Sequence, residues 1–288
     1  MKKLNHKNAL SATVSMLMTL TVCSSVSQAS DIDIYSNATG GKTTITLMLD
    51  TSGSMSESQV GGSACDLASG TSYTRGNEPS GTTPGYTKYF CAVNIPGSSS
   101  QQKRYDRLTR LKDAIFTLMD SNQIDSNSVA MGIGQFSSQS GSDSVYTSPH
   151  GKSGKIDVPA ALLSTTQRTA IKTAVANLRG RGGTPTANAY AEVAAYMLGT
   201  NTSTASNLGY SGFSKSVLGS KVGSSSTATN YQTPLSTTNT QCDGQGIYFL
   251  TDGEPNSSPA PVPLMQAALG ANGSSFSVPA TGTLPNGT

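Results

Sequence analysis

The order of apolar and polar residues along the chain predicts four β-strands. A continuous apolar-rich run at Ile45–Leu49 is typical of a strand that is buried on both faces, and Ile247–Leu250 is interpreted as another buried strand. Val129–Phe136 and Lys155–Ala160 are the two remaining predicted strands. Segments with the helical spacing of apolar residues separate these runs, so strands and helices are expected to alternate.

Four helices are predicted in the same way. Apolar residues recur on one face over about Tyr105–Asp120, and Ser164–Gln167 has the pattern of a capping box that opens a second helix. Thr184–Thr186 starts a third helix, whose apolar face is expected to include Tyr190, and Val262–Leu269 is a short fourth helix. This alternation predicts an α/β fold with a doubly wound, mostly parallel sheet flanked by helices.

Two polar segments interrupt the alternation. The first, at about 57–102, contains four Gly-containing turns and separates the first strand from its helix. The second, at about 199–241, is rich in Ser, Thr and Asn and has no regular period. Both are interpreted as long, solvated insertions into a single domain that spans 30–288.

Two predicted strands are followed by an aspartate in a Gly-containing turn, Asp50 and Asp252. Ligands of an open α/β sheet bind at the carboxyl ends of its strands, so both carboxylates are expected at one edge. Ser52 and Ser54 follow on the first turn, and Thr184 begins a helix that can face the same edge. These hard oxygen ligands predict a site for Mg²⁺, or for Mn²⁺ or Ca²⁺, and the lack of nearby Cys and His argues against zinc.

The ordered set of these residues resembles the metal ion-dependent adhesion site of von Willebrand factor type A domains, over about Lys42 to Leu269. The chain is more similar still to the N-terminal region of the type IV pilus tip adhesin family. That similarity lies in four segments, Asp33–Tyr35, Thr44–Met55, Gly182–Ala187 and Leu250–Asn256. The long insertion after the first metal turn also resembles this family.

The resemblance implies that the hydroxyls of Ser52, Ser54 and Thr184 bind the metal, while Asp50 and Asp252 bind it directly or through water. A metal held by neutral oxygens keeps net positive charge and binds an acidic group on a partner. The implied function is a metal-dependent adhesion module of a type IV pilus tip protein, which supports pilus assembly and attachment to surfaces or host cells. Pilus minor subunits, or a host or surface protein with an acidic group, are the implied partners.

Members of that family continue into a large C-terminal domain, usually a β-propeller with its own calcium site. The type A fold itself has two more strands after the position of Asp252. We therefore expect the chain to be an N-terminal fragment that lacks the C-terminal part of the domain.

The first 29 residues have the pattern of a secretory signal peptide. Lys2–Lys7 is basic, Ala9–Val22 is apolar, and Ser27–Ala29 offers small residues before a cleavage site. A membrane anchor is an alternative, although it needs about 20 apolar residues. A lipidated Cys23 is another, although Val22 stands where a small residue is needed. We expect an exported protein at the cell surface, on a pilus tip or the outer membrane, without a membrane span after signal removal.

Charge and motif content argue against several classes of function. Only 3 of the 19 basic residues fall in the signal, so the remaining 16 balance the 16 acidic residues and give no electrostatic reason to expect nucleic acid. Gly41–Thr43 and Gly151–Ser153 lack the first glycine of a phosphate-binding loop, and His150 is the one histidine outside the signal. A binding module is favoured over an enzyme. A metal-dependent hydrolase or an ATPase-associated subunit with a similar domain is the alternative.

Export also bears on the cysteines, because exported proteins form disulfides. Cys65 and Cys91 flank one Gly/Ser/Thr/Pro-rich stretch, and we predict a disulfide that closes it as a loop. Cys242 is then odd, and its partner is expected beyond residue 288.

Overall fold

The structure is a computed structural model that describes residues 42–136, 152–208, 210–224, 226–235, 243–253, 255–258 and 260–277. All of them belong to one compact unit, Gly40–Thr288. The predicted signal peptide, the Asp33–Tyr35 segment, His150 and Cys242 lie outside the described residues. Within these ranges no helix has the length and apolar character needed to cross a membrane.

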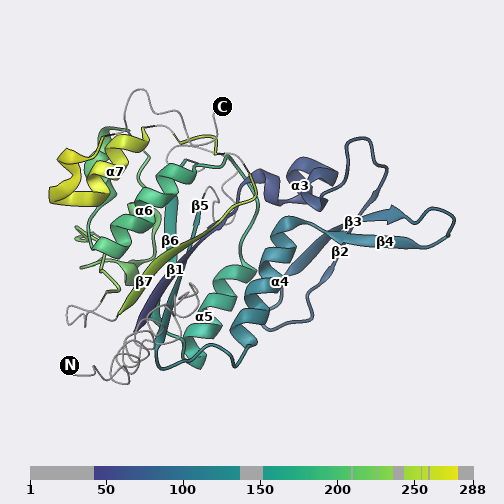
Figure 1. The fold of residues 1–288 in the computed structure, drawn as a ribbon, viewed down its shortest axis with the longest axis horizontal. Coiled ribbons are helices and arrows are strands. Elements are labelled where there is room, and N and C mark those ends of the chain that lie inside the picture. The colour runs from purple at the N-terminus through teal and green to yellow at the C-terminus, as the bar shows by residue number, and fades with distance from the viewer. Residues whose placement is uncertain are drawn as a thin grey trace, which may run out of the picture. The chain divides into compact units, whose positions relative to one another are not determined.

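The centre of the fold is a four-stranded sheet with strand order β6-β5-β1-β7 (Figure 1). Its strands are β1 (Thr43–Asp50), β5 (Val129–Phe136), β6 (Gly154–Leu162) and β7 (Gly244–Leu250). β1 pairs in parallel with both β5 and β7, and β6 pairs antiparallel with β5. The protein is therefore an α/β fold with a mixed, mostly parallel sheet, and the predicted strand positions are confirmed.

Helices cover both faces of this sheet. Leu47 and Leu49 of β1 belong to one apolar cluster and Met48 to another, because successive side chains of a strand point to opposite faces. The first cluster includes residues of α4 (Arg107–Asp120) and α5 (Thr165–Ala176), and the second includes residues of α6 (Thr186–Leu198) and α7 (Pro261–Leu269). The apolar-rich run in β1 thus reflects burial on both faces.

Polar caps mark the starts of α4 and α5. Asp106 caps α4 by accepting a hydrogen bond from the Thr109 amide at 2.8 Å. Ser164 caps α5 in the same way through the amide of Gln167, at 3.2 Å. The predicted capping box is only half correct, because the Gln167 side chain donates to the carbonyl oxygens of Met131 and Pro159 and thereby ties α5 to the sheet.

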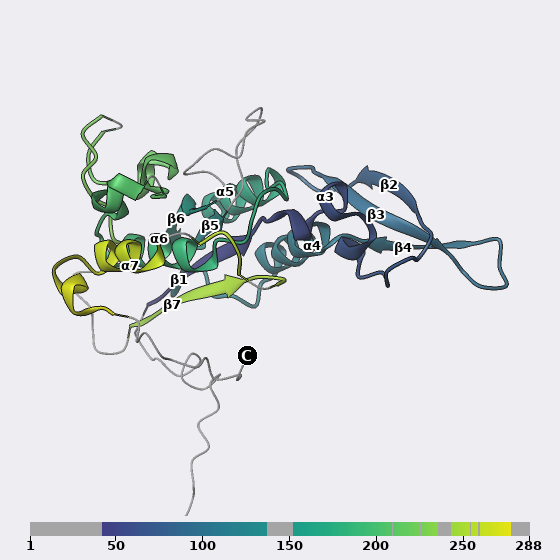
Figure 2. The ribbon, with the colours of Figure 1, turned by 90° about the horizontal axis from the view of Figure 1, so that it is seen from above.

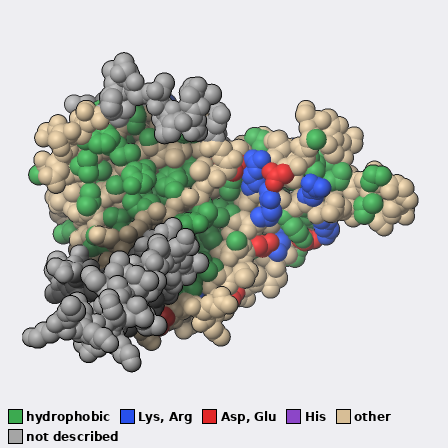
Figure 3. Space-filling model, in the orientation of Figure 1, with side chains coloured by type: hydrophobic (Ala, Val, Ile, Leu, Met, Phe, Trp, Pro, Cys, Tyr) green, Lys and Arg blue, Asp and Glu red, His purple; other side chains and the backbone are tan. Residues whose placement is uncertain are grey.

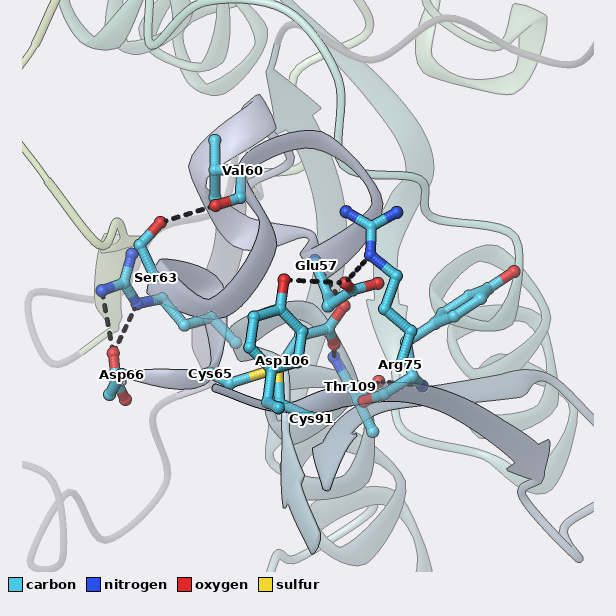
Figure 4. Close-up of a disulfide and its surroundings, with 12 residues drawn as sticks. Glu57, Val60, Ser63, Cys65, Asp66, Arg75, Cys91, Asp106 and Thr109 are labelled. Carbon is cyan, nitrogen blue, oxygen red and sulfur yellow. Dashed lines mark hydrogen bonds and ion pairs between the residues drawn. A yellow bond between two sulfur atoms is a disulfide. The ribbon is translucent and has the colours of Figure 1, made fainter. Parts of the chain in front are cut away.

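The first insertion folds as a small body of its own. It contains the short helix α3 (Glu57–Val60) and an antiparallel sheet of β2 (Thr74–Pro79), β3 (Thr87–Asn94) and β4 (Gln101–Tyr105), which lies apart from the main sheet in both views (Figures 1 and 2). The predicted disulfide between Cys65 and Cys91 is confirmed, and it joins the α3 segment to β3 (Figure 4). Tyr105 pairs with Phe90 in this sheet, so α4 begins two residues later than predicted.

The second insertion is anchored on a buried carboxylate in α6. Glu192 is 1% exposed, and it accepts hydrogen bonds from the hydroxyls of Thr202 and Tyr231 and from the amide of Gly212. The described part of the insertion otherwise contains short 3-10 helices and one β-bridge, between Lys221 and Tyr231. Its described part is therefore held by contacts with α6 and also with β6, where the Ile156 amide donates to the Ser216 hydroxyl at 2.9 Å.

Two predictions about burial are wrong. β7 was expected to be buried, yet Tyr248 is 60% exposed, because β7 pairs with β1 alone among the described strands and forms an edge of the sheet. Tyr190 was expected on the apolar face of its helix, yet it is 45% exposed and only tilts against the ring of Phe249. Alanines at positions 189, 191 and 195 form the buried part of α6 together with larger side chains.

Candidate metal centre

The order of the strands creates a divergence beside β1. The chain passes from β1 outward to β5 and β6, and β7 then pairs with the opposite side of β1. In such sheets the crevice for a ligand lies at the carboxyl ends of the strands where the connections diverge. Asp50 is the last residue of β1 and Asp252 follows β7 by two residues, so both lie at this point.

The two aspartate turns are hydrogen-bonded to each other. Asp50 Oδ2 accepts a bond from the Thr251 hydroxyl at 2.9 Å and one from the Asp252 amide at 3.3 Å. Its other oxygen, Oδ1, accepts a bond from the Ser52 amide at 2.7 Å. Asp50 is fully buried. Because it accepts hydrogen bonds from the amides of Ser52 and Asp252, it fixes the backbone of both turns.

The side chains of the first turn continue this arrangement. The Ser52 and Ser54 hydroxyl oxygens are 2.8 Å apart, and the Ser54 hydroxyl donates to Asp252 Oδ1, also at 2.8 Å. The sequence curls here into a 3-10 turn at Gly53–Met55. Three oxygens from the two turns thus form a continuous row at the sheet edge.

Thr184 lies in a loop that contacts both turns through its backbone. The Gly53 amide donates to the Gly182 carbonyl at 2.9 Å, and the Thr184 amide donates to Asn256 Oδ1 at 2.9 Å. Thr184 is 4% exposed. Among the described hydrogen bonds, none links its hydroxyl to the row of oxygens. The structure therefore joins four predicted ligands directly and brings the fifth to the same edge through the loop.

Burial dominates the electrostatics of Asp50. Loss of solvent raises the pKa of its carboxyl above the usual value, and the negative charge of Asp252 adds to the rise. Hydrogen bonds from Ser52 and Thr251 act in the opposite direction. A divalent cation at this edge would favour the ionised carboxylate, because an opposite charge lowers the pKa of an acid.

Three residues outside the predicted set complete the centre. Thr251 and Asn256 lie in the segment whose sequence suggested the family resemblance, but no role was predicted for either. Arg107 contacts Asp252 Oδ2 through Nη1 at 2.7 Å and comes from the first turn of α4. No local pattern indicates it, since the two residues are separated by 145 positions.

The donor set fits a small, hard cation. Mg²⁺ binds six oxygens at about 2.0–2.1 Å, which places neighbouring ligands about 2.9 Å apart. The 2.8 Å spacings between Ser52 Oγ, Ser54 Oγ and Asp252 Oδ1 are close to that edge length. Across the described ranges, no cluster of three or more His, Cys, Asp and Glu side chains is arranged to hold a metal. A cation at this edge would therefore be bound by hydroxyls beside two carboxylates.

Comparisons of the chain with models of protein families, with curated proteins and with solved structures each found no match. The case for a metal centre accordingly depends on the geometry of this edge and on the motifs in the sequence.

Proposed function

We propose that the chain is a non-enzymatic, metal-dependent binding module with a von Willebrand factor type A-like fold, and that it serves in a type IV pilus tip protein. In this proposal it is exported to the cell surface and supports pilus assembly and attachment to surfaces or host cells. Its partner is a pilus minor subunit or a surface protein that offers an acidic group. The assignment to a pilus is supported by the resemblance of four short segments to the pilus tip adhesin family and by the signal-like N-terminus.

One observation carries the binding proposal. The row of Ser52 Oγ, Ser54 Oγ and Asp252 Oδ1, with both spacings at 2.8 Å, lies at the edge where β1 and β7 diverge. Asp50 holds the backbone that presents this row, so the oxygens are positioned before any ligand arrives. Oxygen ligands that are already in position at a topological divergence suit Mg²⁺, which binds through one or two carboxylates and keeps several waters.

The residues of the edge suit adhesion better than chemistry. A bound divalent cation would be positively charged and would coordinate a carboxylate oxygen of the partner. Ser52 and Ser54 would hold that cation with neutral oxygens, and Asp50 would orient their turn. A single metal–carboxylate contact contributes little net binding free energy, because both groups lose bound water when they meet. The surrounding loops must therefore supply further affinity and the selectivity. Many modules on many pili would then act together through multivalency.

Metal binding is tested first, with the purified chain. We expect one divalent ion to bind in a calorimetric titration with Mg²⁺ or Mn²⁺. Ser54→Ala removes one hydroxyl from the row and should weaken binding roughly tenfold or more, since even supporting groups of metal sites contribute that much. Ser58→Ala is the matched control, because Ser58 is exposed and lies in the same segment, and its hydroxyl bonds to that of Ser56 and, among the described residues, not to the row of oxygens. Equal affinities for the wild type and Ser54→Ala would reject the assignment.

The pilus role is tested in cells, with the same two variants placed in the longest form of the protein that the gene encodes. Piliation and surface attachment would be counted beside a strain that lacks the protein. We expect Ser58→Ala to match the wild type and Ser54→Ala to lose attachment. Full attachment by a Ser54→Ala protein that has lost metal binding would show that adhesion does not use this site.

A further inference from the structure

An ion pair joins the candidate metal centre to the helix that follows the first insertion. Arg107 Nη1 donates to Asp252 Oδ2 at 2.7 Å and to the Ser54 carbonyl oxygen at 3.3 Å. The Asp252 side chain is 8% exposed and that of Arg107 is 29% exposed, so water screens this pair only in part. The other oxygen of Asp252 accepts the Ser54 hydroxyl. Arg107 therefore occupies one side of the same carboxylate whose other side faces the row of hydroxyls.

The first insertion holds Arg107 in this position. Its Nε and Nη2 atoms contact Asp66 Oδ1 at 2.9 and 2.8 Å, and Arg110 Nη2 contacts Asp66 Oδ2 at 2.6 Å. Asp66 directly follows the disulfide-bonded Cys65, which fixes its backbone relative to β3 (Figure 4). The guanidinium of Arg107 is thus fastened on two sides, by Asp66 and by Asp252. Charged side chains of both signs gather over this part of the molecule (Figure 3).

The charges of the centre can be counted from these contacts. Arg110 balances Asp66, which leaves Arg107 as the counter-charge of Asp252. Asp50 and Asp252 together carry −2, so a divalent cation alone would make the loaded centre neutral. With Arg107 included, and counted over the described residues alone, the loaded centre carries +1. A neutral centre has little attraction for a carboxylate, whereas a cationic one attracts it over several ångströms.

We propose that Arg107 determines the specificity of the centre by acting in opposite directions on its two ligands: it weakens the binding of the divalent cation and strengthens the binding of the acidic group. This inference rests on the proposed metal centre. A positive charge beside the ion repels it, and the same charge adds to the field that draws in the partner's carboxylate. Arg107 is a positioning and charge-setting residue here, because it reaches the site through Asp252.

The test compares Arg107→Gln with Arg110→Gln. Both variants remove a partner of Asp66, but only Arg107 contacts Asp252. Titration with Mn²⁺ alone should show roughly tenfold tighter binding to Arg107→Gln than to the wild type, since removal of a nearby partly buried charge is worth about 1.4 kcal/mol or more. Arg110→Gln should change the affinity in the same direction but by less than roughly fivefold, because Arg110 is exposed and reaches the centre only through Asp66.

Acetate is the probe for the acidic group. With each protein saturated with Mn²⁺, displacement of metal-bound water by acetate is followed through water-proton relaxation. Acetate should bind Arg107→Gln roughly tenfold more weakly than the wild type. Asp66→Asn should shift both affinities the opposite way, with weaker Mn²⁺ and tighter acetate binding, because it leaves Arg107 and Arg110 without their shared carboxylate.

The outcomes separate this inference from the metal centre itself. If the wild type binds no divalent ion, the proposed metal centre fails. If the wild type binds Mn²⁺ but Arg107→Gln binds it equally or more weakly, the centre stands and the role of Arg107 is refuted. Circular dichroism identifies any variant that does not fold. In that case Asp66→Asn decides, since a purely structural role predicts no sign reversal.

Discussion

Glu192 gives the protein a dependence of stability on pH that can be worked out from its surroundings. Burial raises the pKa of its carboxyl from 4.5 to about 7, although donors from Tyr231, Thr202 and Gly212 and the charge of Lys221 partly oppose the rise. Between these pH values the folded protein holds a proton that the unfolded chain releases. The stabilisation that comes from this bound proton is complete below pH 4.5. It is lost progressively as the pH rises from 4.5 through about 7. The difference between these two pKa values corresponds to about 3 kcal/mol of stability as an upper value.

Glu192→Gln removes the titration while keeping the shape of the side chain. The amide oxygen can accept the bonds from Thr202 and Gly212, and the amide nitrogen can donate to the Tyr231 hydroxyl, which also contacts Ser216. Urea unfolding of both proteins from pH 5 to 8 measures the difference. We expect the wild type to lose up to about 3 kcal/mol over this range and the variant to be the more stable protein at pH 8. The reasoning would be refuted if the variant were less stable than the wild type at pH 8 and if its free energy of unfolding depended on pH as steeply as that of the wild type.

Two further predictions concern the insertions. Replacement of Cys65 and Cys91 by serine should lower the stability of the first insertion by roughly 3 kcal/mol, because the bridge closes a loop across 26 positions; limited proteolysis within that insertion should become faster, and unchanged protection would contradict this. Gly212→Ala should cost roughly 3 kcal/mol, since an added Cβ would lie 1.6 Å from the Gly154 carbonyl oxygen. Gly246→Ala, which meets nothing within 4 Å, is its control in thermal unfolding, and equal midpoints would show that the second insertion packs differently.

The central sheet was predictable because its buried strands contain short runs of apolar residues that are visible in the local sequence. β1 and β5 each contain an apolar-rich run and are buried over most of their length, and their predicted positions agree with the structure. Two strands of the first insertion, β2 and β4, were missed for the opposite reason. β2 (TRGNEP) and β4 (QQKRY) are polar and mostly exposed, so no alternation of apolar residues marks them. A sheet of this kind is stabilised by a disulfide and ion pairs, which sequence periodicity does not reveal.

The same distinction between local and distant information applies to the candidate metal centre. Asp50, Ser52 and Ser54 lie within one turn, and Asp252 follows the neighbouring strand, so general rules for α/β sheets bring them together. Arg107 reaches Asp252 only through the fold of the first insertion, and no spacing along the chain encodes that contact. The exposure of β7 was mispredicted for a related reason, because the position of a strand at the edge of a sheet is decided by the other strands.

The two ends of the first insertion are hydrogen-bonded to each other. The insertion can therefore change in sequence without moving the aspartate and serine residues of the candidate metal centre. The insertion leaves the core at Glu57 and returns at Asp106, and the Glu57 amide donates to Asp106 Oδ2 at 3.0 Å. A loop whose two ends are already joined can change in length or sequence at little cost to the core, because the entropy of closing it depends only weakly on its length. The contacts of Arg107 with Asp66 and Asp252 are then the route by which such a change reaches the candidate metal centre. Under the proposed role of Arg107, selection on the insertion could therefore alter the charge and selectivity of this candidate centre while Asp50, Ser52 and Ser54 keep their positions.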